Sequence, residues 1–227
     1  MNKIPRLNPF AQRQIEIKES NLGRVLLFCE GPTEHYYFDY FSKIIEKNRN
    51  KYSELDIKSI PANGNAKRVF DFAENFLSNE QNARKFSAYE KNLVFDCDSP
   101  KDIQQIITLM NASPHKYNLL LTNLLFEVWL LMHFESPEYS NSNTKKKIYE
   151  RLSNALGKNY RKASSGIIRQ IIGNGENLKL AIKHAREIES RLFEQKLDIG
   201  HNIAEMNPYT TLHSFMNRIL SEMQRAK

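Results

Sequence analysis

Short apolar runs alternate with amphipathic stretches over the first half of the chain. The strand-like runs are residues 24–30, 55–60, 92–98 and 117–122. The stretches with apolar residues at helical spacing are 33–48, which begins at a potential cap, Thr33, then 66–77 and 102–110. This order of elements is typical of a mostly parallel sheet with helices on both faces. We therefore expect an α/β fold with residues 92–98 as the central strand.

The pattern becomes predominantly helical after residue 122. An apolar stretch at 124–134 predicts a largely buried helix. Further helices are predicted at 144–156, 165–172, 176–195 and 208–225, the last with Asn207 as its cap and Pro208 at its first position. We expect a polar N-terminal arm at residues 1–20, an α/β core at 21–135 and a helical region at 136–227 packed on that core.

Length and composition place the chain among ordinary globular proteins. Its 227 residues allow one domain, or one domain with a sizeable appendage. No apolar run approaches the roughly 20 residues that span a bilayer, and the N-terminus has no signal-peptide core. We expect a cytoplasmic protein without a membrane partner. Cys29 and Cys97 are expected to be small buried residues rather than a disulfide.

Acidic residues follow two of the predicted strands. Asp96 and Asp98 end the third strand two residues apart, so their side chains would point the same way, and Glu30 ends the first strand. The carboxyl ends of parallel strands form the usual site of open α/β sheets. Carboxylates crowded together there favour a bound Mg²⁺ ion. The alternative is that these acids are caps or turn formers.

Two further acids have both a structural and a functional interpretation. Glu34 would lie in the first turn of a helix, where an acid is favoured by the helix dipole, or it would add a carboxylate to the metal site. Glu127 interrupts an apolar stretch, where a carboxylate is costly unless it is paired with Lys or Arg or belongs to a site. His133, in the same stretch, is interpreted as a core or helix-end histidine.

Basic residues are concentrated in one segment. The chain has a net charge of +7, whereas residues 145–186 alone carry eleven Lys or Arg and two acids. Such a block is either a solvated helix surface or a phosphate-binding surface. The candidate nucleic-acid-binding residues are Lys101, Lys145, Lys146, Lys147, Arg151, Tyr160, Arg161 and Lys162.

Several motifs, in this order, resemble the RloB-like family, whose members are related to abortive-infection proteins of bacterial antiphage defence and carry a Toprim fold. The first is Cys29-Glu30-Gly31-Pro32-Thr33-Glu34 with the aromatic residues after it, and the second is Phe95-Asp96-Cys97-Asp98. The stretch from Thr122 to Phe134 is similar to the pattern SNPxFExWLLLHF, with Leu124 where that family usually has proline. Tyr160-Arg161-Lys162 and Asn207-Pro208-Tyr209-Thr210-Thr211 complete the resemblance.

The resemblance implies a Toprim-like core and metal-dependent phosphodiester chemistry. It implies that Glu30 acts as a general acid/base or metal ligand and that Asp96 and Asp98 bind Mg²⁺ or Mn²⁺. Glu34 is a further metal candidate and Glu127 a further catalytic candidate. It also suggests antiphage defence with an ATPase or sensor partner, since this chain has no P-loop. A homo-oligomer is compatible with the sequence.

Three functions remain open from the sequence. The first is a metal-dependent nuclease that cleaves DNA or RNA. The second is a non-catalytic, Toprim-like nucleic-acid-binding or regulatory subunit, which the same basic segment would serve. The third is a phosphatase with an aspartyl nucleophile, because an apolar run followed by two aspartates also opens such enzymes. Glu30 and the Pro100 that follows Asp98 argue against the third function.

Overall fold

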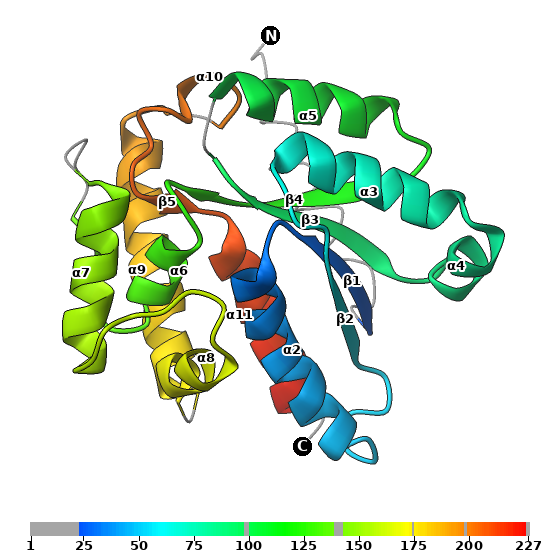
Figure 1. The fold of residues 1–227 in the computed structure, drawn as a ribbon, viewed down its shortest axis with the longest axis horizontal. Helices are drawn as coiled ribbons and strands as arrows, with labels where there is room; N and C mark the ends of the chain where they lie inside the picture. Colours follow the sequence, from blue (N-terminus) through cyan, green and yellow to red (C-terminus); the bar gives the residue numbers. More distant parts are fainter. Residues whose placement is uncertain (1–22, 98–99, 139–142, 174, 198, 226–227) are drawn as a thin grey trace, which may run out of the picture.

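The computed structural model describes residues 23–97, 100–138, 143–173, 175–197 and 199–225 (Figure 1). Its strands form one sheet in the order β2-β1-β3-β4-β5. They are β1 (Arg24–Cys29), β2 (Asp56–Pro61), β3 (Glu90–Asp96), β4 (Tyr117–Asn123) and β5 (Tyr209–Thr210). β1 to β4 are mutually parallel, and β5 is antiparallel to β4. The expected α/β fold with a mostly parallel sheet is confirmed, and β3 is the central strand.

Helices cover both faces of this sheet. α3 (Ala66–Ser78) and α5 (Pro100–Ala112) lie on one face, and α2 (Pro32–Lys47) and α11 (Leu212–Arg225) lie on the other (Figure 1). Phe38 of α2 meets Phe215 of α11 edge to face, with ring centroids 5.9 Å apart. The short, polar α4 (Glu80–Lys85) was not predicted, because it buries no residue and so has no apolar stripe.

The remaining helices gather on the side of the sheet where β3 and β4 end (Figure 1). They are α6 (Glu127–Leu131), α7 (Lys145–Leu156), α8 (Ser165–Ile172), α9 (Glu176–Glu194) and α10 (Ile199–Asn202). The helices predicted at 144–156, 165–172 and 176–195 are confirmed. Their apolar stripes are buried, as in α8, where every Ile faces the core. This arrangement places the basic segment beside the carboxyl ends of the parallel strands.

The helix predicted over residues 124–134 is much shorter in the structure. Only Glu127–Leu131 is α-helical, whereas Leu125 and Phe126 are buried before the helix begins. Asn123, at the end of β4, donates its side-chain amide to Ile203 O at 2.6 Å and Met206 O at 2.9 Å. A continuous apolar run does not distinguish a buried helix from a buried connection, so the sequence overestimated the helix.

The helix predicted to start at Pro208, with Asn207 as its cap, begins only at Leu212. Tyr209 and Thr210 pair instead with β4 and extend the sheet. The hydroxyl of Thr211 accepts a hydrogen bond from Leu121 N at 2.8 Å, and the Thr122 and Thr210 hydroxyls lie 3.1 Å apart. The helical interpretation was wrong because these residues satisfy backbone groups at the edge of β4, a long-range requirement.

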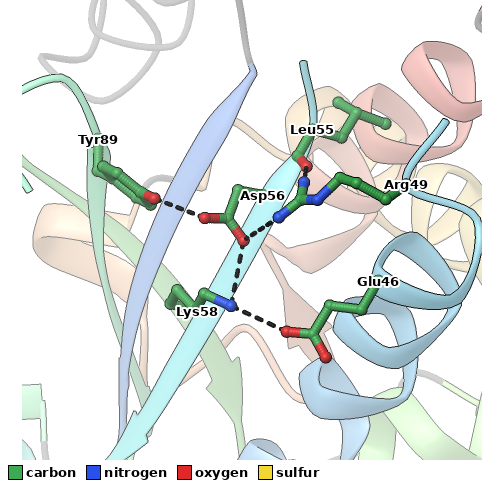
Figure 2. A network of polar contacts seen from close by, with 6 residues as sticks. All are labelled: Glu46, Arg49, Leu55, Asp56, Lys58 and Tyr89. Carbon is green, nitrogen blue, oxygen red and sulfur yellow. Dashed lines mark hydrogen bonds and ion pairs between the residues drawn. The ribbon is translucent and has the colours of Figure 1, made fainter. Parts of the chain in front are cut away.

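The amino end of the sheet carries a paired charge network (Figure 2). Tyr89 donates its hydroxyl to Asp56 Oδ2 at 2.5 Å. Lys58 Nζ lies 3.3 Å from Asp56 Oδ1 and 2.9 Å from Glu46 Oε1, and Arg49 lies 3.7 Å from the same Asp56 oxygen. The acids at this end are therefore held among cations and a hydroxyl donor. Since β1 to β3 are parallel, this network lies at the opposite end from the strand-end acids.

Two smaller expectations can be compared with the structure directly. Cys29 and Cys97 are both buried and are not joined in a disulfide, as expected. Across the described parts of the chain, no helix combines the length and apolar character needed to cross a membrane. The predicted arm at residues 1–20 lies outside the described residues.

Candidate functional site

Glu30 and Asp96 meet at the carboxyl ends of β1 and β3, which are neighbours in the sheet. Glu30 directly follows β1, and its backbone N–H donates to Val94 O at 2.9 Å, which continues the ladder between the strands. Its carboxylate Oε2 accepts a hydrogen bond from Asp96 N at 3.0 Å. Strand pairing thus brings together two acids that are 66 positions apart in the sequence.

Glu34 has the helix-start role that the sequence predicted, and it also lies among the other acids. Its Oε2 accepts a hydrogen bond from Gly31 N at 3.1 Å, which satisfies the backbone N–H of the N-cap residue of α2. The side chain is also buried beside the other acids. Burial raises the pKa of Glu34 to about 7, with a further contribution from Glu127, while its own backbone hydrogen bond and Lys162 act against the rise.

Glu127 opens α6 and is only 1% exposed. Tyr160 donates its hydroxyl to Glu127 Oε1 at 2.9 Å, and Lys162 Nζ lies 3.6 Å from the same oxygen. The costly burial of this carboxylate is therefore offset by a hydroxyl donor and a cation. The pairing with a lysine that the sequence suggested is present, and it lies inside the cluster of acids.

Asp96 feels the electrostatic field of the whole cluster. Its pKa lies well above the usual value, first because of burial and then because of the charges of Glu34, Glu30 and Glu127, which Lys162 partly offsets. Within the described residues, Asp96 Oδ1 is buried without a hydrogen-bond partner. Glu30, Glu34, Asp96 and Glu127 thus form one group of carboxylates, which we call the acidic cluster.

The acidic cluster has the donor chemistry of a site for a hard divalent cation. Its donors are carboxylate oxygens, which Mg²⁺ prefers as ligands. Asp96 Oδ1, which is buried without a hydrogen bond from the described residues, could coordinate such a cation. The described residues, however, include no group of three or more His, Cys, Asp or Glu placed to hold a metal ion. Asp98, the remaining acid of the predicted metal site, lies outside the described residues.

The connection between α7 and α8 lies over the acidic cluster and carries Tyr160 and Lys162. Tyr160 N donates to Ser153 Oγ at 2.9 Å, and Ala163 N donates to Thr33 Oγ1 at 3.1 Å. Burial lowers the pKa of Lys162, but Tyr149 and Glu127 raise it by more, so that its ammonium keeps its proton. These two hydrogen bonds hold the connection in place, and the ammonium of Lys162 lies beside the acids.

The other predicted nucleic-acid-binding residues lie on α7, on the connection after it and on α5. Lys145, Lys146 and Lys147 form the exposed first turn of α7, and Arg161 is exposed. Arg151 is instead paired with Glu135, its Nε lying 2.6 Å from Oε1. The side chain of Lys101, in α5, lies outside the described residues.

Sequence reasoning missed two residues at the site. Thr33 was expected to cap α2, but Gly31 holds that position and the Thr33 hydroxyl binds the connection described above. Tyr149 of α7 stacks on Tyr160 with ring centroids 5.7 Å apart and an interplanar angle of 21°. The signal for Tyr149 in the sequence was an aromatic residue outside the buried stripe of Ile148 and Leu152. His133 is a core histidine, hydrogen-bonded to Tyr37 and to Trp129 O.

Comparison with known protein families identifies a relationship for most of the chain. The family model described as RloB-like protein matches residues 25–219, which include the sheet and the acidic cluster. No curated protein and no solved structure matches the chain. The chain belongs to the RloB-like family.

Proposed function

We propose that this RloB-like chain is a divalent-metal-dependent, Toprim-like nuclease that hydrolyses phosphodiester bonds of DNA or RNA. The proposal rests above all on one observation: four carboxylates converge at the carboxyl ends of two adjacent parallel strands, and one of their oxygens is buried without a partner. At the opposite end of the sheet, Asp56 Oδ1 is also buried without a hydrogen bond from the described residues, but Lys58 and Arg49 lie within ion-pair distance of it. Crowding of carboxylates opposes their ionisation, and such groups are found mainly at functional sites.

The residues have distinct roles in this proposal. Glu30 and Asp96, with Asp98, would hold Mg²⁺ or Mn²⁺, and Glu34 is a further candidate ligand. The ion would neutralise charge at the phosphate and lower the pKa of a bound water. Glu127, oriented by Tyr160, would position or deprotonate the attacking water. Lys162 would offer its ammonium to the phosphate beside the acids. Lys145, Lys146, Lys147 and Arg161 would neutralise flanking phosphates.

A cleavage assay tests the proposal. Plasmid DNA, single-stranded DNA and total tRNA are incubated with wild type in Mg²⁺, Mn²⁺ or EDTA. We expect metal-dependent cleavage that falls at least about 100-fold in Asp96→Asn and in Glu127→Gln, the scale of losing one catalytic group. Asp102→Asn, which removes an exposed acid of α5, is the control with the same change of charge and should cleave like wild type.

Thermal unfolding adds a readout that does not depend on activity. A cation that binds the folded protein at about 100 times its dissociation constant stabilises it by about 2.7 kcal/mol. Mn²⁺ should therefore raise the unfolding temperature of wild type and of Asp102→Asn, but not that of Asp96→Asn. Full cleavage by Asp96→Asn, or an equal metal-dependent shift in that variant, would contradict the proposed site.

A second candidate is a non-catalytic nucleic-acid-binding or regulatory subunit of a larger complex. The observation that favours it is the lack, among described residues, of three acids placed to hold a metal ion. This candidate predicts nucleic-acid binding that is unchanged by EDTA and by Asp96→Asn, together with no cleavage in any metal.

For the biological setting, we propose antiphage defence in the cytoplasm, with an ATPase or sensor protein as partner. A nuclease that attacks cellular nucleic acid has to be restrained until a signal arrives, and this chain has no P-loop of its own. Phage plaque counts on cells that express the chain with its neighbouring genes test this setting. Protection that is equal in wild type and Asp96→Asn cells would contradict it.

A further inference from the structure

A hollow of about 510 Å³ lies next to the acidic cluster, on the outer face of α7. Its volume is within the range of small-ligand sites and is sufficient for one nucleoside. The residues that line it are Lys146, Tyr149, Glu150, Ser153, Asn154 and Asn159. All except Asn159 come from successive turns of one helix face, so α7 forms the floor of the hollow.

The hollow is connected to the acidic cluster through two stacked rings. Tyr149 lines the hollow and stacks on Tyr160, whose hydroxyl donates to Glu127. Lys162 Nζ lies 5.6 Å from the centre of the Tyr149 ring and 3.6 Å from Glu127 Oε1. A group bound against Tyr149 would therefore be separated from Glu127 only by the stacked rings of Tyr149 and Tyr160.

The lining has the chemistry of a nucleobase site rather than of a phosphate site. Lys146 and Glu150 oppose each other, with Nζ 3.8 Å from Oε1, so the lining carries no net charge. Asn154 and Asn159 present exposed amides to the hollow, and amides read the edges of bases. An aromatic ring beside them supplies a stacking surface. The lysines that suit phosphates, Lys145 and Lys147, lie beside the hollow instead.

We infer that this hollow binds one unpaired base of a single-stranded or locally opened nucleic acid, next to the phosphate presented to the acidic cluster. The inference rests on the proposed function and narrows its substrate to strands with an accessible base. A base in a continuous duplex is paired and stacked and would not reach Tyr149. The hollow would fix the position of the strand relative to the acids.

The first test measures binding in EDTA, where no metal-dependent cleavage occurs. Fluorescence anisotropy compares labelled single strands of about 12 nucleotides with the corresponding duplex. We expect single strands to bind more tightly than duplex. Tyr149→Ala should weaken their binding by about 5- to 150-fold, which is the contribution of one base stacked on an aromatic ring, whereas Tyr149→Phe should bind like wild type. Tyr40→Phe, in α2, is the control.

A second variant leaves the ring pair intact. Asn154→Ala combined with Asn159→Ala changes only exposed amides, and it should reduce the differences in affinity among oligonucleotides of A, C, G and U. Asn75→Ala, an exposed amide of α3, should leave these differences unchanged. Wild-type affinity in Tyr149→Ala, tighter binding of duplex, or base preferences that the amide variant retains would each overturn the inference.

Photocrosslinking locates the base directly. Oligonucleotides with one 5-iodouracil are irradiated with the protein in EDTA, digested with trypsin and analysed by mass spectrometry. The crosslink should lie in the peptide of residues 148–151, which contains Tyr149. Crosslinks confined to other peptides would refute the base site even if the protein cleaves nucleic acid. A crosslink at Tyr149 without cleavage in any metal would uphold the base site and refute the nuclease.

Discussion

Replacing Glu34 by glutamine should stabilise the folded protein at neutral and alkaline pH. The amide oxygen of glutamine can still accept the hydrogen bond from Gly31 N at the start of α2. What the substitution removes is a buried group that has to ionise among Glu30, Asp96 and Glu127. Charge is therefore the main property that changes.

The magnitude follows from the pKa of Glu34, which is about 7 in the folded chain against an ordinary value of 4.5. Because the folded state holds this proton more tightly than the unfolded state, the stabilisation is complete below pH 4.5 and is lost as the pH rises through 7. Each pKa unit corresponds to about 1.4 kcal/mol. Wild type should thus lose about 3 kcal/mol between pH 4 and pH 8 that Glu34→Gln retains.

Urea denaturation at a series of pH values, in EDTA, measures this difference. Glu34→Gln should match wild type near pH 4 and exceed its free energy of unfolding by about 3 kcal/mol near pH 8. Glu54→Gln, an exposed position, is the control and should follow wild type throughout. If Glu34→Gln were equally stable or less stable than wild type at pH 8, the view of the acidic cluster as a crowded, destabilising site would be refuted.

Two further predictions use the same measurement. Tyr160→Phe should lower the free energy of unfolding by about 1.5–3 kcal/mol, because the buried carboxylate of Glu127 loses a hydrogen-bond donor. The loss should be clearly smaller when Glu127 is already replaced by glutamine. Equal losses in both backgrounds would mean that the Tyr160 hydroxyl does not act through Glu127. His133 is buried, and burial lowers its pKa from 6.5 to about 4, so its contribution is present above pH 6.5 and is lost as the pH falls towards 4. Wild type should lose about 3 kcal/mol more than His133→Gln over this window, and parallel curves would show that the imidazole titrates normally.

The main features of the fold could be predicted because they follow from local periodicity. The stripe of Val69, Phe70 and Leu77 has helical spacing and packs α3 on the sheet, and the apolar runs around Leu27 and Leu93 are long enough only for strands. Once the strands are parallel, their carboxyl ends lie at one edge. The strand pattern alone therefore also predicted that Glu30 and Asp96 lie close together.

Other features depended on contacts between distant segments. The local sequence predicts that Tyr209 and Thr210 begin a helix. In the structure they pair with the edge of β4, whose backbone groups need hydrogen-bond partners. Tyr160 and Lys162 were predicted only as candidate nucleic-acid-binding residues, because no local pattern reveals that the connection after α7 lies over Glu127. Tyr149 likewise gained a role only by stacking on Tyr160.

The sequence by itself determined the α/β class, the order of most elements and the acids that end the parallel strands. It could do so because helical and strand periodicity, and the alternation of strand and helix, are written in neighbouring residues. Only the tertiary structure decided that Lys162 and the Tyr160 hydroxyl contact the buried Glu127 and that β5 pairs with β4. It also decided which oxygen of Asp96 has no hydrogen bond within the described residues. Those outcomes depend on burial and on pairing across as many as about ninety residues, which no local pattern encodes.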